Sequence, residues 1–411
     1  MKTQDLLFGV TLFILAALLY LLVRTKEPFV NADFQQEPAY QQQMRWLVDT
    51  FGPLEDKLRT YGDAVPEDMP AEQQCFVNFY ALGCRYPSYV GPAQNGYIDA
   101  AVGVTAALQA GCRVFVLDID YLADCTEEAT RYFPRLVVRD VQGRLVIQAS
   151  GNQPFCNTSE TSNIKAVIYQ LVTRAFKGVH SDDPLVLVLY FQRVPPGSAS
   201  SVTVLDYYAH VAEALGGLRS RMLTNETEGV FYRQKQEGQL LMLPISSYAG
   251  RVLVFSNADT SGFRTVTYPV ERDLDYMVHL RLGYTQTRLG VTGQEAHFGT
   301  LQTVEDFTVV PPDRVDDVVA STKQRWTVCL AADPLAPVPL TTVAAVRGMG
   351  VNCVPVNLFD QTVEAIKGFK GHGWMAKPLK LRYIKPPVVV PGVPNPTMDA
   401  KGGALRAPIG I

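Results

Sequence analysis

The fold is indicated first by the stretch Leu108-Gln-Ala-Gly-Cys-Arg-Val-Phe-Val-Leu-Asp118 and by what surrounds it. Upstream, apolar residues recur at helical spacing from Ile98 to Leu108, and Gly111 is a typical residue for ending a helix. Downstream, the run Val114–Asp120 is apolar enough to form a strand that is buried on both faces. This part of the chain therefore predicts a helix that leads directly into a central strand of a parallel sheet.

The same helix-to-strand order repeats along the chain. A helix over 164–172, capped by Asn163, is expected before the strand 185–191. Further helices at 202–218, 341–347 and 362–369 are expected before strands at 251–255, 351–357 and 373–377. Repeated units of this kind make the fold class α/β, and they fit either a (β/α)8 barrel or a doubly wound sheet. Periodicity alone does not choose between these two architectures.

Composition excludes several classes of protein. The chain has 411 residues, of which 47% are hydrophobic and 19% are charged, so it is long enough to bury a large core. Its 37 Lys and Arg residues against 40 Asp and Glu residues give a net charge of −3, which argues against a nucleic-acid partner. The seven cysteines are scattered and predict neither a disulfide framework nor a zinc site.

A membrane anchor is expected at the start of the chain. The stretch from Leu6 through Phe13 and Leu18 to Val23 carries no charge, and as a helix it would be about 27 Å long, close to the hydrocarbon thickness of a bilayer. A cleaved signal peptide is the competing interpretation, but the charged flank 24–28 has no small-residue cleavage site. We therefore expect a single-pass membrane protein with an anchor over residues 1–25. The side of the membrane that holds the remaining chain stays open.

Two further segments differ from the βα pattern. Residues 26–71 mix polar residues, proline and one apolar patch at 44–48, and we interpret them as a tether that can include one short helix. Residues 385–411 form a tail rich in Pro and Gly, which fits neither a helix nor a central strand. The βα region between them spans residues 72–384.

Several motifs resemble phosphoinositide-specific phospholipase C, in the order in which that family carries them. The stretch 111–118 is similar to the family's Gly-Cys-Arg-x-x-Glu-Leu-Asp strand, and 249–254 to its Lys-Gly-Lys-Ile-Leu-Val segment. In the second half, 348–357 and 371–378 resemble the strand ending in Ala-Leu-Asn and the Gly-Tyr-x-Leu-Lys-Pro motif. The resemblance implies a TIM-like barrel with an X-like half at 72–258, a linker at 259–325 and a Y-like half at 326–384.

The resemblance also implies where the reactive groups of the family would lie. In that family two histidines, a metal-binding Asn and carboxylates act on the phosphodiester with a calcium ion. The corresponding positions here hold residues of other types, namely Tyr86, Pro87, Val116, Gly151 and Tyr190. A tyrosine with a pKa near 10 is a poor acid–base group at neutral pH, and proline has no side-chain ligand atom. This comparison predicts a pseudoenzyme, without catalytic residues and without a cofactor.

Weak candidate sites remain beside these replacements. Asp118 and Asp120 lie two apart on a strand, so both carboxylates point to one face and are candidates for a hard cation, although a solvated or hydrogen-bonded role fits them better. Arg85, Tyr86 and Tyr89 are candidates for holding a lipid headgroup, against the alternative that they form a packed loop. The five histidines show no paired spacing that indicates a metal site.

Two functions of different classes follow from these observations. The first is a membrane-anchored scaffold protein, such as a minor capsid protein of a large DNA virus, whose barrel and tail contact other proteins, possible capsid proteins among them, beside the bilayer. It would lie at the interface between a virion's inner membrane and its capsid. The alternative is an anchored, metal-dependent phosphodiesterase, using Ca²⁺ or Mg²⁺, that acts on lipid headgroups through Asp118, Asp120 and a histidine, His180 or His372.

Overall fold

The computed structural model describes residues 37–147, 164–197, 202–223, 233–235, 237–284, 299–359 and 363–385. The predicted anchor with Leu6, Phe13, Leu18 and Val23, the position of Gly151, and all of the tail except Lys385 lie outside these residues. Within the described ranges, no helix combines the length and the apolar character needed to cross a membrane.

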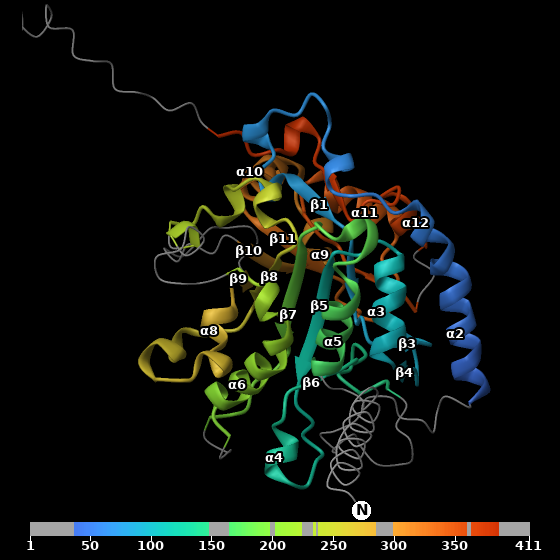
Figure 1. Cartoon of the computed structure of the whole chain (residues 1–411), viewed down its shortest axis with the longest axis vertical. Helices are drawn as coiled ribbons and strands as arrows, with labels where there is room; N and C mark the ends of the chain where they lie inside the picture. Colours follow the sequence, from blue (N-terminus) through green and yellow to red (C-terminus); the bar gives the residue numbers. More distant parts are fainter. Residues whose placement is uncertain are drawn as a thin grey trace, which may run out of the picture.

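The centre of the molecule is a curled, mainly parallel sheet with helices on its outside (Figure 1). The strands are β1 (Phe79–Ala81), β2 (Gly83–Arg85), β3 (Tyr89–Gly91), β4 (Tyr97–Ile98), β5 (Val114–Asp120), β6 (Arg135–Leu136), β7 (Leu185–Phe191), β8 (Val252–Ser256), β9 (Leu280–Tyr284), β10 (Gly299–Thr303), β11 (Trp326–Leu330), β12 (Val356–Asn357) and β13 (Trp374–Ala376). The helices are α2 (Pro38–Phe51), α3 (Ala100–Gln109), α4 (Glu128–Arg131), α5 (Ile164–Arg174), α6 (Val204–Ala214), α8 (Leu274–Met277), α9 (Val304–Thr308), α10 (Val315–Gln324), α11 (Leu340–Gly348) and α12 (Val363–Lys367).

The order of the strands is that of an opened-out barrel. The main sheet has nine strands in the order β11-β10-β9-β8-β7-β5-β2-β12, with β6 added antiparallel to β5. A parallel bridge joins Val328 in β11 to Cys353, which lies just before β12, so the two ends of the sheet approach each other. The fold is therefore α/β with a curled parallel sheet, and this arrangement favours the barrel over the doubly wound sheet.

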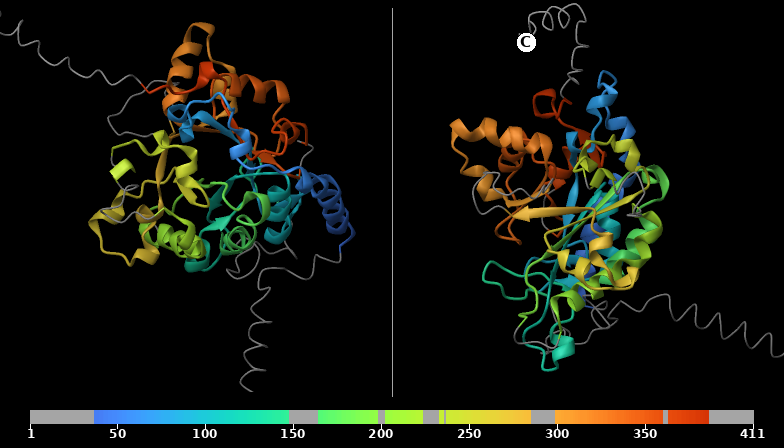
Figure 2. Two further views of the ribbon diagram at one scale, coloured as in Figure 1. Left: turned by 45° about the horizontal axis from the view of Figure 1, so that its top comes forward. Right: turned by 90° about the vertical axis from the view of Figure 1, so that its left-hand side faces the viewer.

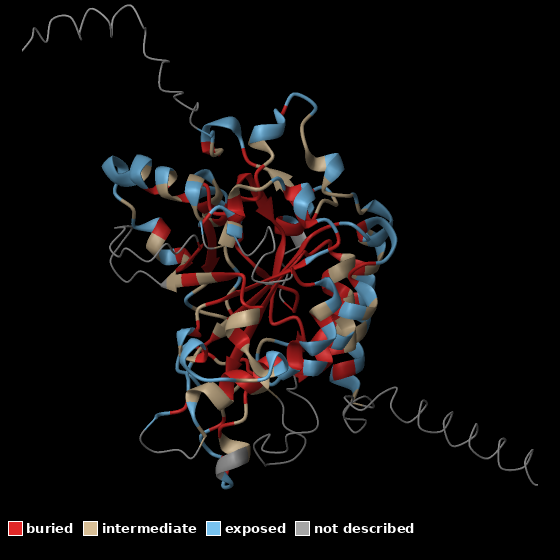
Figure 3. Cartoon of the chain, turned by 60° about the vertical axis from the view of Figure 1, so that its left-hand side comes forward, coloured by how far each residue is buried: buried red, intermediate tan, exposed pale blue. Residues whose placement is uncertain are grey.

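Alternation along the strands separates two apolar layers. Val114 and Val116 of β5 face the interior of the barrel, together with Phe255, Trp326 and Val328 from other strands. The residues between them, such as Phe115 and Leu117, pack against the surrounding helices. Figure 3 shows the same distribution, with buried strands at the centre and exposed helix faces outside. Asp118 and Asp120 continue the inward-facing series and so point into the barrel.

The strand expected at 373–377 has a different role. β13 is antiparallel to β1 and pairs Trp374 with Ala81, outside the main sheet. Phe76 packs against both Trp374 and Trp326, with ring centroids 5.1 and 6.2 Å away. These aromatic rings close the end of the barrel at which the strands begin.

Two expected connecting segments belong to the packed structure. The segment 37–71, part of the expected tether 26–71, begins with α2, which lies alongside the barrel (Figure 2). The buried residues of α2 are Tyr40, Leu47 and Phe51. Apolar residues at helical spacing give α2 one buried face, and this outweighs the polar composition around it. The expected linker 259–325 contains β9 and β10, which are strands of the main sheet.

The state of one cysteine also differs from expectation. Cys125, in the segment after β5, is disulfide-bonded, which its spacing in the sequence did not indicate. The other described cysteines are free and buried, namely Cys75, Cys84, Cys112, Cys329 and Cys353.

Candidate active site at the barrel mouth

The barrel mouth is defined here by the carboxyl ends of β2, β5 and β7, where Arg85, Asp118, Asp120, Tyr190 and Gln192 lie. Parallel strands bring their carboxyl ends to one edge, and in barrels of this class the reactive groups occupy that edge. The register pairs Asp118 with Tyr190 and places Arg85 beside Val116. Residues distant in the sequence therefore meet because the strands are in register.

Arg85 and Asp118 form the central contact of the mouth. The Arg85 side chain donates from Nε to Oδ1 of Asp118 at 3.0 Å and from Nη2 to Oδ2 at 2.7 Å. Gln192 donates from Nε2 to Oδ2 of Asp118 at 2.9 Å, and Arg85 Nη1 donates to the Ala331 carbonyl at 3.2 Å. The Asp118 side chain is fully buried, so these donors replace the water that its charge would otherwise require.

Aromatic rings enclose the Arg85 guanidinium. Its central carbon lies 4.8 Å from the centre of the Tyr86 ring and 5.8 Å from that of Tyr190. Burial opposes the charge of Arg85, but Asp118 and the neighbouring rings outweigh it and raise the pKa of the guanidinium. Burial, and then the charge of Asp118, also raise the pKa of the Tyr86 phenol well above its usual value. Tyr86 is therefore neutral at physiological pH.

Asp120 is held by two arginines that the sequence did not single out. Arg193 donates from Nη2 to Oδ2 at 2.8 Å and from Nε to Oδ1 at 2.9 Å, and Arg139 donates from Nε to Oδ2 at 2.9 Å. Hydrogen bonding to Asp120 raises the pKa of Arg193, whose guanidinium lies 4.5 Å from the centre of the Tyr121 ring. The Arg193 side chain is 44% exposed, so this end of the network meets solvent.

Both aspartates are engaged by arginine guanidinium groups. Each carboxylate accepts hydrogen bonds from at least one arginine on both of its oxygens. In the part of the chain that the structure describes, no group of three or more His, Cys, Asp or Glu residues is arranged to hold a metal ion. A Ca²⁺ ion prefers six to eight oxygen ligands, which Asp118 and Asp120 in this arrangement do not offer.

The remaining predicted site residues, Tyr89, Val116 and Pro87, pack or hydrogen-bond within the fold. Tyr89 is buried, donates from its hydroxyl to the Pro92 carbonyl at 2.7 Å and accepts from the Gly96 amide at 2.9 Å, so it holds its own loop together. Val116 belongs to the apolar interior. Pro87 is buried, and its carbonyl lies against Gly103 so closely that a Cβ there would approach it to 2.2 Å. Gly103 thus allows α3 to pack on this loop.

The histidines named for the alternative function lie away from the mouth. His180 precedes β7, and its Nδ1 is 2.5 Å from Oδ2 of Asp183. The Nδ1 of His372 is 3.3 Å from the Thr60 carbonyl, next to β13. Both belong to the end of the barrel at which the strands begin, so the structure does not bring either of them to Asp118.

Asn257 also lies at the mouth, and the sequence did not predict that its side chain would hydrogen-bond to a neighbouring strand. Its side chain accepts from the Phe191 amide at 2.8 Å and donates to the Phe191 carbonyl at 3.0 Å, which ties β7 to the end of β8. The feature of the sequence that could have indicated this role is the position of Asn257 directly after an apolar strand. The same signal applies to Gln192 and Arg193, which follow β7.

Comparisons with known proteins concern the fold. No family model matches the chain, and no curated protein matches it in sequence. Among solved structures it is similar to PLC21 from L. pealei, with 14% identity, a TM-score of 0.49, and coverage of 78% of this chain and 41% of that one. For PLC21 from S. officinalis the identity is 15%, the TM-score 0.48, and the coverage 77% and 40%. The chain thus spans about two-fifths of the length of both proteins.

A bacterial structure is similar over nearly its whole length. It is the calcium-dependent phosphoinositol-specific phospholipase C of a Pseudomonas species, with 11% identity, a TM-score of 0.44, and coverage of 74% of this chain and 96% of that one. The prediction of a non-enzyme is corrected at this point, because the structures that resemble this chain are those of phospholipase C enzymes. At these identities the likeness assigns neither an activity nor its loss to this chain, whose fold is similar to that of phosphoinositide-specific phospholipases C.

Proposed function

We propose that the chain is a membrane-attached scaffold protein whose barrel is a rigid module that joins a bilayer to other proteins. The observation that supports this proposal is the ion-pair network at the mouth. Arg85 and Asp118 link β2 to β5, while Arg139 and Arg193 hold Asp120 at the end of β5. A network of paired charges around two buried carboxylates restricts the strands to one arrangement. Such rigidity suits a module that holds a bilayer and a partner protein at a fixed distance from each other.

The connection to the bilayer would run through α2. Tyr40 in this helix donates from its hydroxyl to Oδ2 of Asp99 at 2.7 Å, and the Tyr97 hydroxyl donates to Oε2 of Glu37 at 2.6 Å. These contacts fix the start of α2, which lies within the expected tether 26–71, to the barrel. An anchor at residues 6–23 would therefore connect, through residues 24–36, to a helix that is packed on the barrel.

We extend the proposal to a minor capsid protein between an inner viral membrane and a protein shell. This extension depends on the order of anchor, barrel and Pro-rich tail in the sequence. Scaffolding and catalysis are compatible, since an anchored enzyme can also connect a membrane to an assembly. The proposal therefore includes no claim that the barrel is inactive.

A phosphodiesterase acting on lipid headgroups is the second candidate. The observation in its favour is that Asp118, Asp120 and the half-exposed Arg193 meet at the edge where barrels of this class carry out chemistry. An arginine with an exposed edge can bind a phosphate oxygen. For Asp118 to act on a bound phosphodiester, it would first have to separate from Arg85.

One preparation tests both functions. The full chain is isolated with its native membrane, solubilised gently and analysed by native mass spectrometry after chemical cross-linking. The scaffold proposal expects a stoichiometric complex with other proteins, and recovery only as a monomer would contradict it. The same preparation is incubated with phosphatidylinositol and glycerophosphodiesters in Ca²⁺, Mg²⁺ or EDTA. Metal-dependent headgroup release that Asp118→Ala abolishes, and that the exposed control Asp63→Ala retains, would support the phosphodiesterase.

A further inference from the structure

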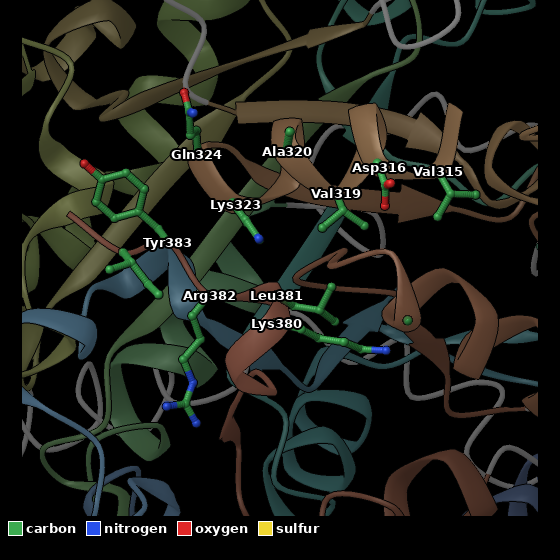
Figure 4. A pocket seen from close by; sticks show the side chains of 12 residues that line it. Val315, Asp316, Val319, Ala320, Lys323, Gln324, Lys380, Leu381, Arg382 and Tyr383 are labelled. Carbon is green, nitrogen blue, oxygen red and sulfur yellow. The ribbon is translucent and has the colours of Figure 1, made fainter. Parts of the chain in front are cut away.

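A groove separates α10 from the chain segment that follows β13 (Figure 4). We call it the α10 groove; it has a volume of about 640 Å³ and runs between α10 and residues 380–384. Val319 on the helix and Leu381 on the opposite segment point toward each other in Figure 4. Leu381 is only 2% exposed, which makes it the floor of the groove.

The rim of the α10 groove is basic. Lys323 on α10, together with Lys380 and Arg382 on the opposite segment, lines it, and Asp316 is the acidic lining residue. Arg382 donates to the Lys377 carbonyl and to Oε1 of Gln73, so its charge meets no carboxylate in these contacts. Among the ion pairs of the described residues, none includes Lys323 or Lys380. The groove therefore combines an apolar floor with two lysines that form no ion pair among the described residues.

A second cavity continues the groove. It has a volume of about 620 Å³ and shares Gln324 and Tyr383 with the α10 groove. Its lining adds two basic residues, Arg325 and Lys385, and two acidic ones, Glu72 and Glu237. The two cavities are therefore neighbours on the surface, an arrangement that suits an extended peptide segment better than a compact metabolite.

We propose that the α10 groove binds an acidic segment of a partner protein that carries apolar side chains between its carboxylates. The carboxylates would meet Lys323 and Lys380, and the apolar side chains would cover Val319 and Leu381. Charge complementarity of this kind guides association and selects among partners. A flat membrane surface would meet the rim but would not reach the buried Leu381.

The chain's own tail is a poorer match for this groove. The tail leaves the described structure at Lys385, beside both cavities. Residues 386–411 contain one acidic residue, Asp399, and two basic ones, Lys401 and Arg406. A tail with this charge would add cations to a basic rim, so a partner segment fits the electrostatics better.

The position of the groove is consistent with a scaffold. The groove lies beside the aromatic closure at the amino ends of the strands, because the segment that lines it follows β13. A partner bound there would leave the mouth at the opposite end free (Figure 1). This inference rests on the proposed scaffold function and names its docking surface.

The test measures binding of a defined probe to the full chain in lipid nanodiscs. The probe is a fluorescein-labelled 15-residue peptide with Glu at about a third of its positions and Leu at every third or fourth, and its binding is followed by fluorescence anisotropy. The charge-reversed variant Lys323→Glu/Lys380→Glu should bind it about tenfold more weakly, because each exposed pair contributes up to roughly 1 kcal/mol. The matched control Lys57→Glu/Lys177→Glu changes two exposed lysines that line neither cavity and should bind like the unchanged chain.

Two further arms make the test decisive. A Cβ at Gly348, which lines the groove, would meet no atom within 4 Å, so Gly348→Gln should place a side chain in the groove and weaken binding without strain. Three outcomes would each overturn the proposal. A peptide with Lys in place of Glu binds as tightly as the acidic probe, or a 15-nucleotide single-stranded DNA displaces the probe as well as the unlabelled peptide does. In the third, the probe binds only after residues 386–411 are removed. Because this readout contains no other protein, its failure is distinguishable from the absence of a complex in native membranes.

Discussion

Arg85 and Asp118 join β2 to β5 through two parallel hydrogen bonds, and the side chains of both residues are at most 7% exposed. Breaking a buried ion pair by removing one partner leaves the other charge without compensation, which typically costs about 3–5 kcal/mol. We therefore expect Arg85→Met to lower the free energy of unfolding by about that amount. Urea unfolding of the full chain in detergent, followed by circular dichroism, measures this change.

The control for this pair is a variant that removes both charges. Arg85→Gln/Asp118→Asn keeps polar groups at both positions and should recover at least half of the loss, because no charge remains buried alone. A double variant as unstable as Arg85→Met would show that the loss comes from packing and not from the unpaired carboxylate.

Because Lys377 is buried, we expect the free energy of unfolding to depend on pH in the neutral to alkaline range. The residue is fully buried, its Nζ donates to the Thr322 carbonyl at 3.2 Å, and burial lowers its pKa from 10.5 to about 7. Between pH 7 and 10.5 the unfolded chain binds more protons than the folded chain at this site, so its contribution to stability rises with pH. The slope of this contribution is at most about 1.4 kcal/mol per pH unit.

The comparison variant for this prediction is Lys377→Met, which fills similar volume without a charge. It should be more stable than the unchanged chain at pH 7, and its advantage should shrink as the pH rises toward 10. Urea unfolding at a series of pH values gives the difference between the two proteins, in which other titrating groups cancel. A difference independent of pH would contradict a neutralised Lys377.

His279 should also make the free energy of unfolding rise with pH, but in a lower pH range than Lys377. Burial lowers its pKa from 6.5 to about 4, and its Nδ1 accepts from the Val254 amide while Nε2 faces the Leu223 carbonyl at 3.2 Å. Because the folded chain holds this ring neutral, stability should fall as the pH falls from 6.5 to 4, by up to roughly 3 kcal/mol. His279→Gln should flatten this part of the curve, and a curve as steep as that of the unchanged chain would contradict a ring held neutral by burial.

The hydrogen bond between Tyr40 and Asp99 predicts how firmly α2 is attached. Tyr40→Phe removes the donor to Oδ2 of Asp99 while Val102 still donates its amide to Oδ1, so we expect a loss of about 1 kcal/mol. Hydrogen exchange over residues 38–51 should become faster, while exchange in β5 and β7 stays the same. Unchanged protection of α2 would mean that its apolar face alone holds it.

Sequence patterns predicted the central elements where local and tertiary preferences agree. Apolar runs located β5 and β7 within their structural bounds, because such runs form strands in any parallel sheet. They missed β10, whose sequence Gly-Thr-Leu-Gln-Thr has polar side chains at three of its five positions. This segment is a strand because β9 and β11 lie on both sides of it. The strand at 374–376 was expected, but its antiparallel partner was not, since partner choice depends on the closure of the barrel.

The mouth was only partly predictable for a related reason. Asp118 and Asp120 were identified from their place at the end of a strand, and period-two alternation correctly put both on one face. Their partners Arg139 and Arg193 lie 19 and 73 residues from Asp120, in segments without a distinctive pattern. Pairing across such distances is set by strand register and loop path, which a single sequence does not specify.

The aromatic closure of the barrel determines what intrinsic fluorescence can report. Trp326 and Trp374 both contact Phe76, and the third tryptophan of the chain, Trp46, packs against Phe51 in α2 with ring centroids 5.9 Å apart. The fluorescence of these tryptophans would therefore report on unfolding at the amino ends of the strands and at α2. It would not change when only the mouth, at the carboxyl ends of the strands, rearranges. A tryptophan introduced in place of Tyr190 would supply the missing optical signal from the mouth.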